Sequence, residues 1–265
     1  MCELLAMSSS QPTRLTFSLH ALAARGSLTR STHDGWGVAF YQGRDVALFR
    51  EPTPAADSAL VRFLESQGPA TDLAISHIRH ATRGAVSLAN TQPFVRELGG
   101  FRHVFAHNGD LPGIFDSAAP ACGRFEPVGT TDSERAFCTL LARLAALWRG
   151  AAPPPLDARL AVLGAFAAEL RALGPANFLY ADADALFAHG HRRKQPGQAR
   201  AAPPGLWWLA QECATEVAGV SVGRAAQSVV LLASVPLSDA AWRPLAEGEL
   251  LVVRAGRVEA SALQQ

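Results

Sequence analysis

Apolar residues recur at helical spacing in three stretches of the chain. These stretches are residues 12–25, 131–148 and 157–173. In the first, Leu15, Leu19 and Leu22 fall on one helical face, and Gly26 follows as a helix-ending residue. The second opens on Thr131-Asp132-Ser133-Glu134, which has the form of a capping box. The pattern predicts three helices, the last two adjacent in the chain.

Shorter runs have the alternation and the β-branched or aromatic content typical of strands. A short strand is expected before the first helix, and a hairpin around Gln42-Gly43 over residues 37–50. Further strands are predicted at residues 73–78, 103–107, 177–180, 185–188, 206–210, 228–234 and 249–254. Strands, two central helices and strands again do not form a regular βαβ alternation. The order favours an α+β fold in which sheets pack on each other with helices outside.

Turn-forming residues mark two loops, at residues 150–156 and 192–205. The second mixes prolines with Arg192, Arg193, Lys194 and Arg200, and we expect an exposed excursion with solvated basic side chains. No internal repeat or low-complexity tract divides the 265 residues. The prediction is one domain over residues 1–265, or 2–265 after removal of Met1.

Composition narrows the class of partner. Hydrophobic residues make up 49% and charged residues 18%, which is typical of a globular chain, and the longest apolar run, residues 160–168, is too short to span a membrane. The formal net charge of +1 lacks the basic excess of a general nucleic-acid binder. We therefore expect a small-molecule or protein partner, with no nucleic acid and no membrane.

The cysteines and histidines do not have the spacing of a metal site. Cys2, Cys122, Cys138 and Cys213 contain no CxxC pair, so reduced thiols are expected. The pairs His77/His80 and His189/His191 lack the spacing of a zinc protease, and no metal is predicted. No basic leader opens the chain, so a cytoplasmic location is expected.

Cys2 is the first candidate for catalysis. Removal of Met1 would leave a residue that carries a thiol and a free α-amine together. The amine has a pKa of about 8 and the thiol of about 8.5, so the pair can exchange a proton near neutral pH. The alternative is a small buried thiol near a chain end, which is common for free cysteine.

Polar residues that follow predicted strands supply the other candidates. Asn108 and Gly109 could offer a side-chain and a backbone donor to an oxyanion, or form a simple turn. Arg79 or Arg83 could hold a carboxylate, or be solvated. Asp132 could bind an ammonium group, or only favour the start of a helix.

Taken together and in this order, the motifs resemble those of the class II (type 2) glutamine amidotransferases, most closely the stand-alone bacterial members. The matching pieces are Met1-Cys2, Asp34-Gly35-Trp36-Gly37, His77-Ile78-Arg79-His80-Ala81-Thr82, Asn90-Thr91-Gln92-Pro93-Phe94, His107-Asn108-Gly109 and Thr131-Asp132-Ser133-Glu134. The resemblance spans most of the chain. It implies the N-terminal nucleophile hydrolase fold, a four-layer αββα sandwich of two antiparallel sheets between helices.

The resemblance also implies a role for each matching residue. Cys2 would be the nucleophile, with its own α-amine as base, and the oxyanion hole would consist of Asn108 and Gly109. Arg79 and Asp132 would bind the α-carboxylate and α-ammonium of glutamine, and Thr82 would line the pocket. No cofactor is implied. Ammonia would be released, and a separate synthase subunit would bind its acceptor.

Two departures from the family pattern concern the details of the glutamine loop and not the nucleophile. Glu3-Leu4 stands where many synthase-linked members have Gly-Ile, and His80 stands where they place an aromatic residue. One alternative substrate is a γ-glutamyl conjugate, as in the similar ergothioneine-pathway amidohydrolases. The other alternative is a catalytically silent binding or scaffold protein that keeps the fold.

Overall fold

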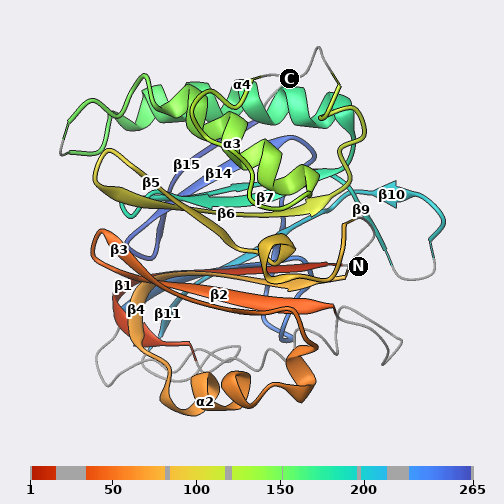
Figure 1. Ribbon diagram of the computed structural model, residues 1–265. Coiled ribbons are helices and arrows are strands. Elements are labelled where there is room, and N and C mark those ends of the chain that lie inside the picture. The colour runs from red at the N-terminus through yellow and green to blue at the C-terminus, as the bar shows by residue number, and fades with distance from the viewer. Residues whose placement is uncertain are drawn as a thin grey trace.

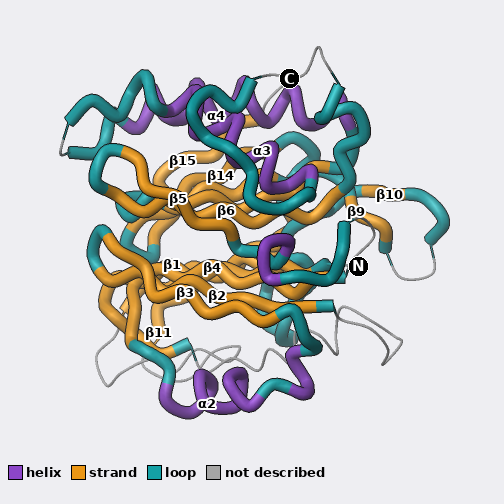
Figure 2. The backbone as a smooth tube through the Cα atoms, viewed as in Figure 1, coloured by secondary structure: helices purple, strands orange, loops and turns teal. Residues whose placement is uncertain are grey.

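The computed structural model describes residues 2–15, 34–80, 84–116, 121–150, 152–195, 198–213 and 227–263. Two antiparallel sheets are stacked face to face, with helices on both outer sides (Figure 1). In Figure 2 the strands of the two sheets form adjacent layers between α2 below and α3 and α4 above. The chain therefore has the α+β, four-layer architecture expected from its sequence.

The first sheet has seven strands, with β1 at its centre. Its spatial order is β13 (Arg243–Pro244), β11 (Trp207–Cys213), β12 (Gln227–Ala233), β1 (Glu3–Arg14), β4 (Ala70–Arg79), β2 (Gly35–Gln42) and β3 (Asp45–Glu51). Strand β1 pairs antiparallel with both β12 and β4. The N-terminal strand is thus held between two neighbours rather than at an edge.

The second sheet has six strands. Its order is β15 (Arg257–Leu263), β14 (Glu249–Arg254), β8 (Leu186–His189), β7 (Ala176–Ala181), β6 (Phe101–Gly109) and β5 (Phe94–Leu98). A separate hairpin joins β9 (Arg193–Lys194) to β10 (Ala201–Ala202). In Figure 1 this hairpin projects on the side of the molecule where the N-terminus lies.

Three apolar layers hold the sandwich together. The layer between the sheets contains Leu4 and Ala6 of β1, Ile75 of β4 and Ala106 of β6. A second layer lies between the first sheet and α2 (Ala59–Gln67). The third lies between the second sheet and the helices α3 (Asp132–Leu144) and α4 (Leu156–Leu173). Burial of these apolar side chains is the main force that stabilises the stack.

The helices predicted from residues 131 and 157 are confirmed as α3 and α4, and α3 begins with the expected Thr131 cap. The Thr131 hydroxyl caps the helix by accepting from the Glu134 N–H at 3.2 Å. The Glu134 carboxylate accepts from the Gly129 N–H at 2.6 Å and pairs with Arg96. The Glu134 side chain therefore connects the segments that contain Gly129 and Arg96 to α3, while its N–H bonds the Thr131 cap.

Three expectations from the sequence differ from the structure. Residues 12–14, predicted as the start of a helix, belong to β1, while residues 16–25 of that predicted helix lie outside the described residues. Helix α2 and two short 3₁₀ helices, Ala55–Asp57 and Leu88–Asn90, were not predicted. Trp148, expected at the end of a helix, follows α3 beyond a turn and is buried.

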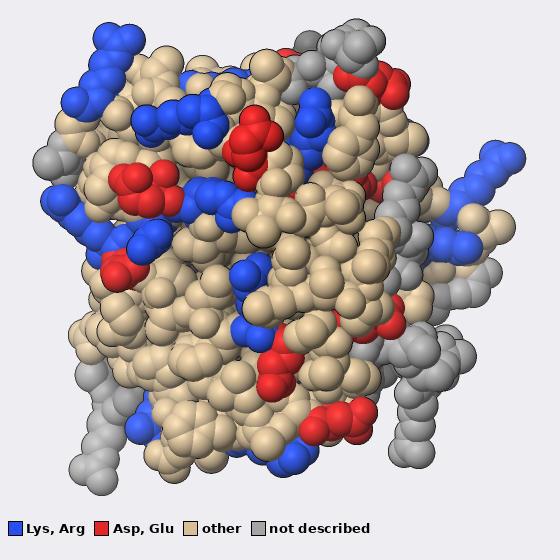
Figure 3. Space-filling view, viewed as in Figure 1, with Lys and Arg blue, Asp and Glu red and all other residues tan. Residues whose placement is uncertain are grey.

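Surface charge is mixed on the face shown in Figure 3, where Lys and Arg side chains alternate with Asp and Glu side chains. This agrees with the near-neutral net charge of +1. Among the described residues, no helix is long and apolar enough to cross a membrane.

Candidate active site

The alternation of side chains along three strands brings the predicted residues to one end of the space between the sheets. Leu4 and Ala6, Ile75, and Ala106 all belong to the apolar layer between the sheets. Because side chains alternate with a period of two, Cys2, Arg79 and Asn108 continue the same faces of β1, β4 and β6. Polar residues thus replace the apolar ones at this edge of the layer, where β1 begins and β4 and β6 end.

Cys2 is half-buried and makes contacts through both its thiol and its carbonyl. The Sγ atom donates to the His80 carbonyl at 3.4 Å and accepts from the His80 N–H at 3.3 Å. The Cys2 carbonyl accepts from Asn108 Nδ2 at 2.6 Å. Burial raises the pKa of the Cys2 thiol, and the His80 N–H partly opposes this by stabilising the thiolate.

Asn108 and Gly109 form the last two positions of β6 and do not form a hairpin turn. Both are paired with β7, through the register Asn108↔Asn177 and Gly109↔Ala176. Asn177 Nδ2 also donates to the Asn108 carbonyl at 3.1 Å. A Cβ atom at position 109 would lie 1.8 Å from the Pro175 carbonyl oxygen, so only glycine fits here.

Arg79 and Asp132 approach the same site from β4 and from the first turn of α3. Arg79 is buried, and its Nη2 donates to the Gly84 carbonyl at 3.2 Å, so the solvated alternative is wrong. The Asp132 carboxylate accepts from the Leu111 N–H at 2.9 Å and from the Ser133 N–H at 2.7 Å. These bonds hold the carboxylate at the helix start, where the helix dipole favours a negative charge.

A small cavity of about 40 Å³ brings these groups together. Its lining comes from β1, β4, β6 and the start of α3 and includes Cys2, Arg79, His80, Gln92, His107, Gly109, Asp110, Thr131, Asp132 and Ser133. Thr82, the remaining predicted residue, lies outside the described residues. Four of the six predicted residues line this cavity, and a fifth, Asn108, contacts Cys2 directly.

A second cavity, of about 250 Å³, also adjoins Cys2. It shares Cys2, His80, Gly109 and Asp110 with the first cavity. Its remaining lining residues are Asn108, Pro175, Arg192, Arg193, Lys194 and Ala201, so the β9–β10 hairpin forms one wall. The expectation that the basic residues of this loop are solvated is wrong for Arg193, which is buried and paired with Glu3.

Sequence analysis did not assign a role to Gln92. Its side-chain amide bonds both backbone groups of His107, accepting from the N–H at 2.6 Å and donating to the carbonyl at 3.1 Å. This pairing fixes the end of β6 immediately before Asn108. The sequence shows Gln92 within the Asn-Thr-Gln-Pro segment, but it does not show its partner, because His107 lies 15 positions away and is brought near by the fold.

Neutral histidines surround the site. Burial lowers the pKa of His77 to about 3, with His107 and Arg79 adding to the effect. Burial also lowers the pKa of His107, whose Nδ1 lies 2.9 Å from the Ser133 hydroxyl. The described residues contain no group of three or more His, Cys, Asp or Glu side chains arranged to hold a metal ion.

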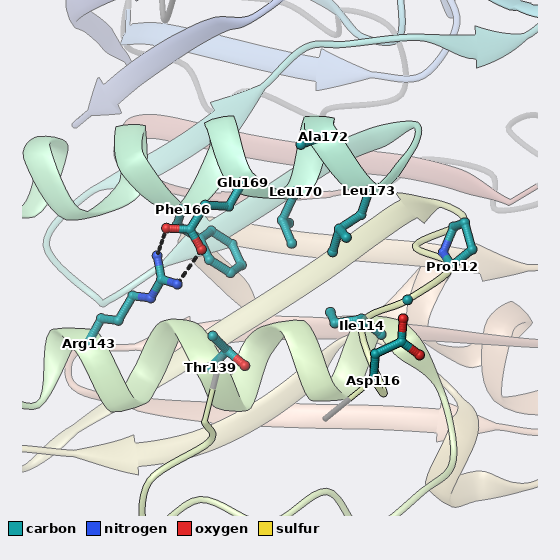
Figure 4. Close-up of a pocket in the computed structure, with 11 residues that line it drawn as sticks. Pro112, Ile114, Asp116, Thr139, Arg143, Phe166, Glu169, Leu170, Ala172 and Leu173 are labelled. Carbon is teal, nitrogen blue, oxygen red and sulfur yellow. Dashed lines mark hydrogen bonds and ion pairs between the residues drawn. The ribbon is translucent and has the colours of Figure 1, made fainter. Parts of the chain in front are cut away.

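A larger cavity, of about 520 Å³, lies elsewhere, between α3, α4 and the segment after β6. Figure 4 shows Phe166, Leu170 and Leu173 on its apolar side and the paired Arg143 and Glu169 at its rim. It contains none of the predicted catalytic residues. Size alone therefore does not decide between the cavities, and the convergence of polar groups makes the cavity at Cys2 the candidate site.

Comparison with known proteins places the chain and its fold in a class. The family model described as "Glutamine amidotransferases class-II" matches residues 1–265, and the chain belongs to this family. The resemblance inferred from the motifs is thus confirmed. The chain has the N-terminal nucleophile hydrolase type of fold seen in glutamine amidotransferase structures.

Particular relatives are similar over most of the chain. "Putative glutamine amidotransferase YafJ" of Escherichia coli (strain K12) is 39% identical over 71% of this chain and 72% of its own. A predicted glutamine amidotransferase from Pseudomonas aeruginosa has a solved structure with a TM-score of 0.71 and 33% identity, covering 98% of this chain and 100% of its own. The glutamine phosphoribosylpyrophosphate amidotransferase of B. subtilis, at 15% identity and a TM-score of 0.59, shares the fold over 100% of this chain and 49% of its own.

Proposed function

We propose that this protein is an amidohydrolase that cleaves the γ-carboxamide of glutamine through a thioester on Cys2 and releases ammonia. The observation that carries the proposal is the contact between Asn108 Nδ2 and the Cys2 carbonyl, at 2.6 Å. It supports a role for Asn108 as a donor beside the nucleophile, in the position that an oxyanion would need.

The proposed reaction begins with proton transfer from the Cys2 thiol to the α-amine that removal of Met1 exposes. The thiolate attacks the γ-carbonyl carbon, and the resulting oxyanion accepts from Asn108 Nδ2 and the Gly109 N–H. The C–N bond then breaks, and ammonia leaves with the transferred proton. Water hydrolyses the thioester, which gives glutamate and restores the thiol.

A base close to the thiol is needed because burial raises the pKa of Cys2. A buried thiol with a raised pKa is mostly protonated near neutral pH and is a weak nucleophile. The α-amine belongs to the same residue as the thiol, so it can accept the thiol proton without the help of another side chain. This supports the α-amine, rather than a histidine, as the base.

Recognition of the glutamyl group is assigned to the two charged residues of the small cavity. The Arg79 guanidinium is of the type that binds a carboxylate through two parallel hydrogen bonds. Asp132, held by two backbone N–H groups, supplies a fixed negative charge for the α-ammonium. Thr82 is proposed as a further lining residue, and the acceptor of ammonia would be bound by a separate synthase subunit.

The test uses protein shown by intact mass to begin at Cys2. It should release glutamate and ammonia from glutamine, and Cys2→Ala should release neither. Cys138→Ala is the matched control, because Cys138 is a buried thiol in the helix layer outside the site. Equal activity of Cys2→Ala and wild type would refute the proposal. Retention of Met1 would favour the silent scaffold alternative, whereas labelling of Cys2 by a diazo-ketone glutamine analogue would oppose it.

The second cavity favours one alternative substrate, a γ-glutamyl conjugate. Ammonia needs about the space of one water molecule, roughly 30 Å³. The second cavity beside Cys2 has about 250 Å³, which leaves room for a larger amine. Comparison of kcat/KM for glutamine with a panel of γ-glutamyl amides tests this. A preference for glutamine over every member of the panel would reject it.

A further inference from the structure

Glu3 and Arg193 form a buried ion pair beside Cys2. Both side chains are almost completely buried, at 0% and 1% exposure, and Arg193 Nη2 donates to Glu3 Oε1 at 2.8 Å. The two residues are 190 positions apart in the sequence. The pair therefore joins the start of β1 to the β9–β10 hairpin, two segments that are remote in the chain.

Arg193 also reaches a second contact that holds the same strand. Its Nη1 donates to the Ser234 carbonyl at 2.7 Å. Ser234 in turn holds the backbone of Leu4, because its Oγ accepts from the Leu4 N–H at 2.9 Å and its N–H donates to the Leu4 carbonyl at 3.0 Å. Residues 3 and 4 are thus fixed through side chain and backbone by one connected network.

Stability alone is a poor explanation for this ion pair. Desolvation of two charges costs about as much as their attraction returns, and replacement by apolar residues is often neutral or stabilising. A buried pair does fix geometry, because each charge strongly disfavours any arrangement that leaves it without its partner. The residue before this pair is Cys2, which lies just outside the first paired position of β1, Glu3↔Ile78.

We propose that Arg193 is a positioning residue that, through Glu3 and Ser234, holds the first residues of β1 so that Cys2 faces Asn108. This inference rests on the proposed role of Cys2 as nucleophile. Arg193 lines the second cavity together with Cys2, so the same side chain connects the hairpin wall to the reacting residue. The β9–β10 hairpin therefore sets the position of the nucleophile as well as the boundary of the cavity.

Two variants separate positioning from a purely structural role. Arg193→Met leaves Glu3 buried without its partner and is expected to lower stability. The double variant Glu3→Gln/Arg193→Met removes both charges and is expected to fold with a Tm close to that of wild type. Its control is Arg159→Met/Asp182→Asn, which removes another buried ion pair, outside both cavities that Cys2 lines, and leaves Asp184 paired with Arg254.

The double variant should lose kcat by about 10- to 100-fold, because small displacements of a nucleophile are costly. KM for glutamine should stay within about twofold, since Arg79 and Asp132 are unchanged. The control variant should keep the wild-type kcat. Hydrogen exchange supplies a readout that does not depend on turnover: amides of residues 3–6 should exchange about tenfold faster in the double variant and not in the control.

The outcomes distinguish the two proposals. If wild-type protein that begins at Cys2 turns over neither glutamine nor γ-glutamyl amides, the proposed function is refuted. The exchange measurement would still decide the role of Arg193. Wild-type kcat in the double variant, or unchanged exchange of residues 3–6, would overturn the inference. A fall in kcat together with faster exchange confined to the start of β1 would support it.

Discussion

His107 and Asn108, at the end of β6, are held by hydrogen bonds with neighbouring side chains. The amide nitrogen of Asn108 is directed at Cys2. The Asn108 carbonyl bonds Asn177, while its amide nitrogen bonds the Cys2 carbonyl. The preceding residue, His107, is fixed by both atoms of the Gln92 amide. In the proposed mechanism, donors held in this way would stabilise the negative charge that develops on the substrate oxygen.

Asn108→Ala is expected to lower kcat for glutamine by about 10²- to 10³-fold with little change in KM, because one oxyanion donor is lost. Steady-state release of glutamate measures both constants. Gln42→Ala, which removes an exposed amide at the end of β2, serves as the control. An unchanged kcat in Asn108→Ala would exclude Asn108 from the oxyanion hole.

Buried histidines make stability dependent on pH. The pKa of His77 is lowered to about 3, mainly by burial, while an unfolded histidine has a pKa of about 6.5. Below pH 6.5 the unfolded chain binds a proton that the folded chain does not. The free energy of unfolding therefore falls as the pH decreases from 6.5 towards 3, by about 2 kcal/mol at pH 5 for this residue.

His77→Leu should remove this contribution, because leucine carries no titratable group. Urea unfolding at pH 8 and pH 5 gives the measurement. The fall in unfolding free energy between the two pH values should be about 2 kcal/mol smaller in the variant than in wild type. An identical fall in both proteins would contradict the assignment.

The packing of β6 against β7 sets the backbone at Gly109, the proposed oxyanion donor. Gly109 lies so close to Pro175 that no side chain can be accommodated. Its N–H is thus positioned by the close approach of two chain segments, and the glycine is required by space rather than by an unusual backbone angle.

Gly109→Ala is expected to force β6 and β7 apart, with lower stability and a loss of glutamine hydrolysis larger than the loss of folded protein. Thermal unfolding and activity per folded molecule give the comparison. Gly150→Ala is the matched control, because a Cβ there meets nothing within 4 Å. Full activity in Gly109→Ala would show that the close contact is not needed.

Elements with strong local signals could be predicted from the sequence, and those set by distant partners could not. Helices α3 and α4 combine apolar periodicity with clear end signals. Residues 12–14 also fit a helical pattern, but Thr13 and Arg14 pair with Thr71 and Ala70 in the sheet. Tertiary pairing overrides local preference there. Helix α2 was missed because only Val61 and Leu64 of its nine residues are buried.

The same distinction applies to the candidate site. The order of motifs predicted Cys2, Arg79, Asn108, Gly109 and Asp132, and the fold gathers them around one small cavity. The partner of Glu3 could not be predicted, because a contact across 190 positions leaves no local pattern. The second cavity, which Arg193 also lines, was equally absent from the sequence signals.

On the scale of the whole molecule, the outer helix layer is attached to the second sheet by a charge network as well as by apolar packing. Arg159 of α4 is buried and bonds Asp182 at 2.8 Å and Asp184 at 2.6 Å. Arg254 of β14 bonds Asp184 from the other side. The network thus connects α4 to the β7–β8 turn and to β14.

Arg159→Met should destabilise the protein by about 3–5 kcal/mol, because it leaves Asp182 buried without its partner. Arg254→Met, which removes the more exposed arginine of the network, should cost less than about 1 kcal/mol. Urea unfolding measures both. Similar losses in the two variants would indicate that burial of Asp182 does not determine the cost.

The position of the first strand has a practical consequence for making the protein. Cys2 adjoins both cavities, so extra residues fused before it would block its amine and crowd the space intended for substrate. Leu263, in contrast, is 68% exposed at the end of the edge strand β15. For a test of the proposed function, an affinity tag is therefore better placed after β15, and an amino-terminal fusion should be cut so that the cysteine becomes the first residue.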